Sequence, residues 1–205
     1  HMGQLVNLQT PDGGVLPSWV ALPEGPQRGA VVVLQEIFGV NSHIRAVTER
    51  FAARGFAAVA PALFYRLAPC DTLGVELGYS EADVRSGRDF KVQAEALPPP
   101  GVQLAVRTAV DWLASTTGQK VGVVGFCWGG LLAWRAACTL PQLSAAVCYY
   151  GGGMTSPEER SRQPLCPVMA HFGRQDAFIP QDSVLAFDQA QPQAFVGPLL
   201  AHGVA

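Results

Sequence analysis

Gly125-Phe126-Cys127-Trp128-Gly129-Gly130 separates two apolar runs of this 205-residue chain. The run before it is Val121 to Val124, and the run after it is Leu131 to Ala137, which Arg135 interrupts. A short apolar run of this kind is typical of a strand that is buried on both faces. Glycines on both sides of the cysteine leave room for a sharp reversal of the chain. The sequence therefore predicts a strand, a tight turn and a helix, with Cys127 at the apex of the turn.

The same six residues match the G-x-S-x-G pattern, with sulfur in place of the usual hydroxyl oxygen. In that motif the central side chain projects from the sheet edge and acts as a nucleophile. Cys127 is also expected at a helix N-terminus, which favours a thiolate over a thiol. The alternative is a small core residue in a glycine-rich turn, because cysteines are often buried and inert. The catalytic interpretation needs an acid and then a histidine later in the chain.

Length and composition indicate one compact domain over residues 1–205. Hydrophobic residues make up 49% of the chain and charged residues 15%, which excludes a disordered protein. The net charge of −2 gives no electrostatic reason to expect nucleic acid or an anionic membrane as a partner. No apolar segment reaches the ~18 residues of a membrane span, and no secretory signal is visible. We interpret His1-Met2 as a cloning remnant.

The five cysteines form no CxxC pair, and their number is odd. Neither a zinc site nor a disulfide framework is therefore indicated. Cys138, Cys148 and Cys166 lie in apolar runs and are predicted to be small buried residues, and Cys70 follows a proline in a loop. A reducing cytoplasm suits this set of thiols best.

Strands and helices alternate along the chain. Strands are predicted on both sides of the turn Pro11-Asp12-Gly13-Gly14 and at 30–34, 56–60, 121–125, 145–150, 168–172 and 194–200. Helices are predicted over 42–54 with Ser42 as its cap, over 80–96 and 102–115, from the elbow to Leu140, and after Pro180. This order predicts an α/β fold with a mostly parallel sheet and helices on both faces. Glu36, Cys127, Gly151 and Asp176 follow four strands, so they are expected at one sheet edge, where such folds bind ligands.

An acid and a histidine follow the elbow in the required order. Asp176 ends the string Gly173-Arg174-Gln175-Asp176 after a predicted strand, although it could equally be a turn residue that caps the next helix. His202 is the one histidine after it, and the alternative for His202 is a solvated residue near the chain end. His43 belongs to the first helix and His171 to a strand, so neither is preferred as the base.

Glu36 lies two residues after Leu34, the last residue of a predicted buried strand. Its carboxylate could face solvent, cap the following helix, or enter the pocket and take the proton of the Cys127 thiol. An acid near a cysteine also raises the pKa of the thiol by charge repulsion. The backbone N–H groups of Ile37 and Trp128 are candidates for an oxyanion hole, because the residue after the nucleophile supplies one donor in this arrangement.

Five short segments together resemble the dienelactone hydrolase family of α/β-hydrolases, from about residue 30 to residue 180. The segments are Gln35 to Asn41, Val59 to Phe64, Gly125 to Gly130, Tyr149 to Gly151 and Gly173 to Asp176. The resemblance implies hydrolysis of dienelactone to maleylacetate without a metal or cofactor, and related members act on other esters. It also implies Cys127 as the nucleophile, assisted by Asp176, His202 and Glu36.

The resemblance is weakest at the C-terminal end. The family usually has a phenylalanine and a long final helix after its histidine, whereas this sequence ends with His202-Gly203-Val204-Ala205. We therefore expect the C-terminal helix to be missing. The family also holds the substrate carboxylate with arginines, and Arg85 and Arg88 lie in the corresponding region. The alternative for both arginines is a solvated helix face.

Three other functions compete with a lactone hydrolase. One is a broad carboxylesterase or thioesterase, and another is a non-catalytic α/β-hydrolase scaffold that binds a small ligand. A nucleotide-binding role is disfavoured, because Gly125 to Gly130 has neither the lysine of a P-loop nor the G-x-G-x-x-G order. The expected partner is a small ester or lactone, and the sequence does not indicate an oligomeric state.

Overall fold

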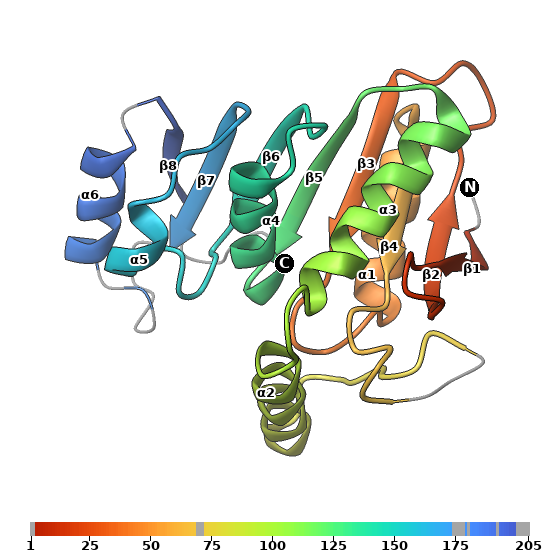
Figure 1. The fold of residues 1–205 in the computed structure, drawn as a ribbon, viewed down its shortest axis with the longest axis horizontal. Coiled ribbons are helices and arrows are strands. Elements are labelled where there is room, and N and C mark those ends of the chain that lie inside the picture. The colour runs from red at the N-terminus through yellow and green to blue at the C-terminus, as the bar shows by residue number, and fades with distance from the viewer. Residues whose placement is uncertain (1–2, 69–71, 174–178, 180, 192, 200–205) are drawn as a thin grey trace. The chain divides into compact units, whose positions relative to one another are not determined.

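The computed structural model describes residues 3–68, 72–173, 179, 181–191 and 193–199 (Figure 1). Its contacts divide the chain into two compact units, His1–Gly122 and Val123–Ala205, and each is described by itself. The expectation of a single domain over 1–205 stays a prediction.

The first unit contains four strands and three helices. The strands are β1 (Gln4–Gln9), β2 (Val15–Ala21), β3 (Gly29–Leu34) and β4 (Phe56–Pro61), in the spatial order β1-β2-β4-β3. β1 pairs with β2 and β2 with β4 in antiparallel fashion, whereas β3 and β4 are parallel. The helices are α1 (Ser42–Ala53), α2 (Glu81–Glu95) and α3 (Val102–Thr117). α1 and α3 cover opposite faces of these strands (Figure 1).

The second unit continues the alternation of strands and helices. β5 (Val121–Phe126) begins just before it, and α4 (Trp128–Thr139), β6 (Ala145–Tyr149), α5 (Pro157–Arg160), β7 (Val168–Gly173), α6 (Gln181–Ala190) and β8 (Phe195–Leu199) follow. The spatial order is β5-β6-β7-β8, and β6 pairs with β7 and β7 with β8 in parallel. Together with the parallel β3–β4 pair, this confirms the predicted α/β class with mostly parallel strands.

Apolar burial explains why the helices form where the sequence predicts them. The predicted stripe of α3, which consists of Val106, Val110 and Leu113, is fully buried. α4 is buried around most of its circumference, which accounts for its nearly continuous apolar sequence. Within the described part of the chain, none of the helices has the length and apolar character that crossing a membrane requires.

One local prediction about the helices was wrong, and one short helix was not predicted. α1 is capped by Asn41 and not by Ser42, because the Asn41 Oδ1 atom accepts a hydrogen bond from the Ile44 N–H at 3.2 Å. The unpredicted helix is α5, a single turn with Ser156 as its N-cap. A helix this short has no apolar periodicity to detect.

β8 is a strand although it contains Gly197-Pro198. In its pairing with β7, Gly197 lies opposite His171 and Pro198 opposite Phe172. A proline has no N–H to donate to a neighbouring strand, so its position in the last strand of the order fits its chemistry. Residues 200–205, where the family would continue into its final helix, lie outside the described residues.

Candidate active site

The turn between β5 and α4 holds Cys127 in a conformation that is unusual for any residue other than glycine. Cys127 has φ 57° and ψ −118°. A residue with a side chain in this region costs about 1–3 kcal/mol, and such strain is concentrated at functional sites. Gly125 permits the turn, since a Cβ atom on it would lie 1.9 Å from the Gly129 carbonyl oxygen. The predicted elbow is therefore present, with the cysteine at its apex.

Backbone hydrogen bonds fix the elbow on both sides. The Cys127 carbonyl oxygen accepts from the N–H groups of Gly130 at 2.9 Å and Leu131 at 3.3 Å, and so begins α4. The Cys127 N–H donates to the Tyr149 carbonyl oxygen at 2.9 Å, which ties the turn to the end of β6. Trp128 is the first helical residue, where N–H groups have no acceptor within the helix. Its predicted role as an oxyanion donor stays a prediction.

The side chain of Cys127 is partly exposed, in contrast to that of Cys148, which is buried. Burial raises the pKa of the Cys148 thiol and raises that of Cys138 to about 12. Burial also raises the pKa of Cys166. These three thiols are therefore protonated at neutral pH and poor nucleophiles. The prediction that all three are buried was wrong for Cys138 and Cys166, which are partly exposed.

Three rings form a stack across neighbouring strands beside the elbow. Phe126 and Tyr149 stack with centroids 5.2 Å apart, and Tyr149 and His171 stack at 5.0 Å. Burial lowers the pKa of His171, so its ring is mainly neutral at pH 7. This stack could not be predicted from the sequence, because nothing in one strand indicates which residue of the next strand lies beside it.

The turn after β3 places Glu36 and Ile37 in the first unit. Gln35 supports this turn, since its side chain accepts from the Leu63 N–H at 2.9 Å and donates to the Glu36 carbonyl oxygen at 3.0 Å. Burial raises the pKa of the Glu36 carboxyl, and a hydrogen bond from the Tyr79 hydroxyl partly opposes that shift. The Glu36 Oε1 atom is buried and has no hydrogen-bond partner among the described residues.

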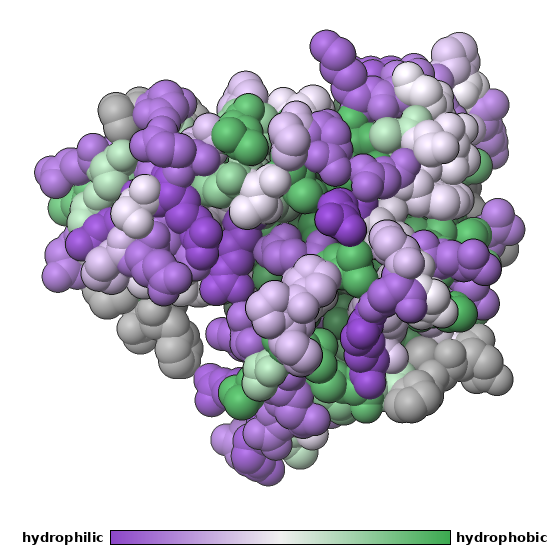
Figure 2. All heavy atoms as spheres, in the orientation of Figure 1, coloured by the Kyte–Doolittle hydropathy of each residue, from purple (hydrophilic) through white to green (hydrophobic). Residues whose placement is uncertain are grey.

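Gly87 of α2 packs directly against Ile37. A Cβ atom at Gly87 would lie 2.7 Å from the Ile37 carbonyl oxygen. Arg85 and Arg88 of the same helix are both exposed. At about 100° per residue, Arg85 lies nearly opposite the Gly87 contact and Arg88 beside it. Figure 2 shows hydrophilic side chains over much of the viewed face of α2.

Two predicted catalytic residues fall outside the described residues. Asp176 lies within residues 174–178 and His202 within residues 200–205. Their roles as acid and base stay predictions. Among the described residues, no group of three or more His, Cys, Asp or Glu side chains could hold a metal ion.

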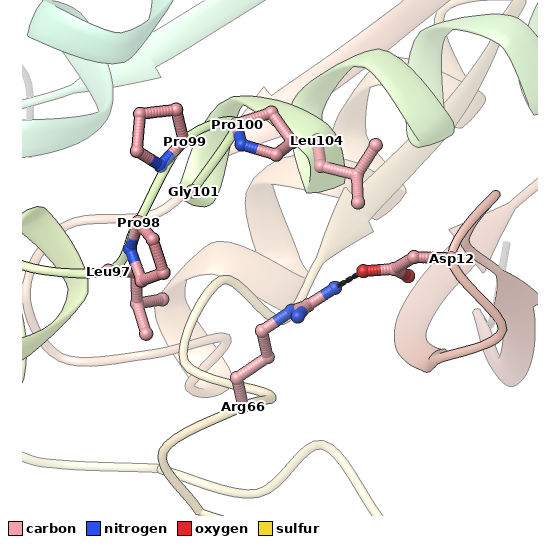
Figure 3. A pocket seen from close by; sticks show the side chains of 8 residues that line it. All are labelled: Asp12, Arg66, Leu97, Pro98, Pro99, Pro100, Gly101 and Leu104. Atoms are coloured by element: carbon pink, nitrogen blue, oxygen red, sulfur yellow. Dashed lines mark hydrogen bonds and ion pairs between the residues drawn. The ribbon is translucent and has the colours of Figure 1, made fainter.

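A small cavity of about 160 Å³ in the first unit involves none of the predicted site residues. Its lining is Asp12, Arg66, Leu97, Pro98, Pro99, Pro100, Gly101 and Leu104. Asp12 and Arg66 point toward each other from two loops and form an ion pair (Figure 3). The hydrogen bonds of Asp12 with Thr10 and Arg66 lower its pKa to about 2. This cavity is smaller than the ~300 Å³ of a typical small-molecule site, and its charges already neutralise each other.

Known proteins match nearly the whole chain. The model of the dienelactone hydrolase family matches residues 16–196. A Synechocystis protein assigned as a carboxymethylenebutenolidase is 35% identical over 192 residues, which cover 90% of this chain and 74% of that protein. The carboxymethylenebutenolidase of Pseudomonas putida is 31% identical over 179 residues, covering 87% of this chain and 73% of that protein. A Klebsiella pneumoniae crystal structure assigned as a dienelactone hydrolase has a TM-score of 0.75 and 28% identity, covering 97% of this chain and 85% of that one.

Proposed function

The chain belongs to the dienelactone hydrolase family, and we propose that it hydrolyses a small lactone or ester with Cys127 as the nucleophile. Its fold is that of the α/β-hydrolases, and the family acts on small molecules. The observation that carries the proposal is Cys127 itself, a partly exposed thiol with φ 57° at the first turn of α4. A non-glycine residue kept in this conformation indicates a functional position.

In the acylation step, Glu36 accepts the proton of the Cys127 thiol, and the thiolate attacks the ester carbonyl carbon. The C=O double bond becomes a C–O⁻ single bond, and the N–H groups of Ile37 and Trp128 stabilise this oxyanion. When the C=O bond reforms, the bond to the leaving oxygen breaks, and that oxygen departs as an enolate or alkoxide. The product is a thioester between the acyl group and Cys127.

In the deacylation step, His202 removes a proton from water, and Asp176 orients its ring. The hydroxide attacks the thioester carbonyl carbon, and the sulfur leaves as a thiolate. Glu36 returns its proton to the thiolate, and the proton held by His202 passes to the leaving oxygen anion. The acid is then released and the enzyme is restored without a metal or cofactor. For a lactone that carries a carboxylate, a dienelactone being the first candidate, Arg85 or Arg88 would bind that group by bidentate pairing.

The reactivity of the thiols tests the proposal directly. We expect iodoacetamide at neutral pH to alkylate Cys127 before the other four cysteines, as read by peptide mass spectrometry. Cys127→Ala should remove hydrolysis of both p-nitrophenyl acetate and a dienelactone, whereas Cys138→Ala should retain it. The proposal fails if Cys127 labels no faster than the others and Cys127→Ala keeps full activity.

The same assays separate the competing functions. Hydrolysis of p-nitrophenyl acetate without hydrolysis of a dienelactone would indicate a broad carboxylesterase or thioesterase. Tight binding of a carboxylate ligand without turnover of any short ester would indicate a non-catalytic scaffold. We also propose a cytoplasmic location, because a nucleophilic thiol needs a reducing compartment to stay available.

A further inference from the structure

Strained backbone occurs at two neighbouring positions in the second unit. Among the residues that the structure describes, Cys127 and Tyr150 are the two that combine a positive φ with a side chain, at 57° and 38°. A side chain is unfavourable in this conformation, and such strain is concentrated at active sites and ligand-binding positions. Cys127 is the proposed nucleophile. The strain at Tyr150 therefore indicates a second functional position.

One peptide unit connects the elbow to β7 and ends at Tyr150. The Tyr149 carbonyl oxygen accepts from the Cys127 N–H at 2.9 Å. The Tyr150 N–H donates to the His171 carbonyl oxygen at 2.6 Å. This carbonyl and this N–H belong to the same planar peptide unit and point in opposite directions. Tyr150 is therefore fixed at the carboxyl end of β6, directly beside the elbow.

After Tyr150 the chain packs on the first turn of α4. A Cβ atom on Gly130 would lie 2.7 Å from the Tyr149 carbonyl oxygen and 2.9 Å from the Gly151 Cα atom. A Cβ atom on Gly151 would lie 3.0 Å from the Leu131 nitrogen. The peptide unit before Tyr150 is held by two hydrogen bonds, and the residue after it lies against α4. The φ of Tyr150 therefore has little freedom to relax.

Glycine would adopt this φ without strain, but the position holds a tyrosine. Residues 151–153 are all glycine, so Tyr150 supplies the single side chain of residues 150–153. This side chain is half-buried, and so it is not a core residue that packing alone accounts for. In α/β folds, ligands bind at the carboxyl ends of the strands. Tyr150 places an aromatic side chain at such an end, next to Cys127.

We propose that Tyr150 is a substrate-positioning residue, whose ring packs against the acyl group that is bonded to Cys127 during the reaction. A phenol ring has a flat π face, which packs well on another flat, conjugated group. The ring therefore selects planar unsaturated acyl groups over small saturated ones. This inference rests on the proposed function, since the acyl group is that of the Cys127 thioester.

Two p-nitrophenyl esters with the same leaving group test the inference. The crotonate has a planar unsaturated acyl group, whereas the acetate has the shortest acyl group with a methyl. Tyr150→Asn removes the ring and keeps a residue that tolerates positive φ. We expect kcat/KM to fall about 10-fold or more for the crotonate and less than about 3-fold for the acetate. Tyr150→Phe keeps the ring and should keep the parent's preference.

The ratio of the two kcat/KM values separates positioning from a structural effect. A variant that is merely less well folded loses activity on both esters by the same factor. Tyr65→Asn is the matched control, because it removes a buried ring from the first unit and should leave the ratio unchanged. An equal loss on both esters in Tyr150→Asn, or an unchanged preference for the crotonate, would overturn the inference.

Alkylation of Cys127 gives a measurement that does not depend on turnover. N-Ethylmaleimide is a planar conjugated electrophile, and iodoacetamide is a small flexible one. In Tyr150→Asn we expect N-ethylmaleimide to label Cys127 more slowly than in the parent, with the iodoacetamide rate unchanged, as read by peptide mass spectrometry. Activity retained in Cys127→Ala would contradict the proposed function. The ratio of the two labelling rates would still decide whether Tyr150 packs against a group bonded to this sulfur.

Discussion

The elbow at Cys127 and the turn at Glu36 are both predicted to serve the reaction, but different forces hold them in place. The elbow is shaped mainly by neighbouring residues, because Gly125 and Gly129 approach each other closely and the Cys127 carbonyl oxygen starts α4. One longer-range bond, from the Cys127 N–H to the Tyr149 carbonyl oxygen, adds to this. The Glu36 turn depends on residues that are distant in sequence, because the Leu63 N–H donates to the Gln35 side chain and the Leu77 N–H donates to the Phe38 carbonyl oxygen.

This difference shows that a short motif can specify the shape of one catalytic position but not the chemical environment of another. The backbone strain at Cys127 is a local property. The ionisation of Glu36 depends on burial and on a phenol from another segment. Substitutions at the elbow should therefore act on the chemical step or on folding as a whole, whereas substitutions around Glu36 should act on pH dependence and local order.

The largest expected effect is on the chemistry at the elbow. Cys127→Ser keeps the size of the side chain but replaces a thiol with a far less acidic hydroxyl. We expect kcat/KM to fall on the order of 10³-fold or more, while the free energy of unfolding changes by less than about 0.5 kcal/mol. Ester hydrolysis and denaturant unfolding measure the two quantities. Equal rates for the two enzymes would show that the sulfur is not the nucleophile.

Gly125→Ala tests whether the elbow is locally determined. The new Cβ atom would meet the Gly129 carbonyl oxygen at 1.9 Å, between a strand and a helix that are both buried. We expect a loss of about 3 kcal/mol or more in unfolding free energy. Gly152→Ala is the control, because no atom lies within 4 Å of its Cβ position. It should change stability by less than about 0.5 kcal/mol, and a similar result for both variants would contradict the argument.

Gly39→Ala tests the long-range contacts that support Glu36. It combines an unfavourable φ of +80° with a contact of 1.9 Å to the Val75 carbonyl oxygen. We expect a smaller loss than at Gly125, about 2 kcal/mol, because the 74–79 segment is not a strand or helix and can shift. Gly118→Ala has a positive φ but no atom within 4 Å, and it should cost roughly 1 kcal/mol. Thermal melts of both variants would show whether Gly39→Ala loses more stability than Gly118→Ala.

Among these variants, Glu36→Gln should have the smallest effect on stability, and that effect should depend on pH. Burial raises the folded-state pKa of Glu36 above its ordinary value of 4.5, so folding favours the protonated form. This stabilisation is present at acidic pH and is lost as the pH rises through the raised pKa. We therefore expect Glu36→Gln to melt at a higher temperature than the parent at neutral pH, with the difference closing at acidic pH. A difference independent of pH would show that ionisation is not its cause.

Much of the fold could be predicted from local sequence. Apolar runs and glycine punctuation located strands such as β3 and β4, because burial on both faces leaves a clear composition signal. The errors arose where short-range features compete. Asn41 and Ser42 are both good N-caps. In the structure Asn41 has the extended backbone conformation of an N-cap and its side chain reaches the Ile44 N–H, whereas Ser42 is already the first residue of the helix.

The amino-acid sequence alone determined the strand–turn–helix at Cys127, because Gly125 and Gly129 on either side of the cysteine allow the chain to reverse there. It also carried enough family resemblance to identify the dienelactone hydrolase family, which the comparisons confirm. Only the tertiary structure brought Tyr79 to Glu36 and stacked Tyr149 between Phe126 and His171. The physical reason is that side-chain contacts between distant segments depend on strand register and loop path, which no local pattern encodes.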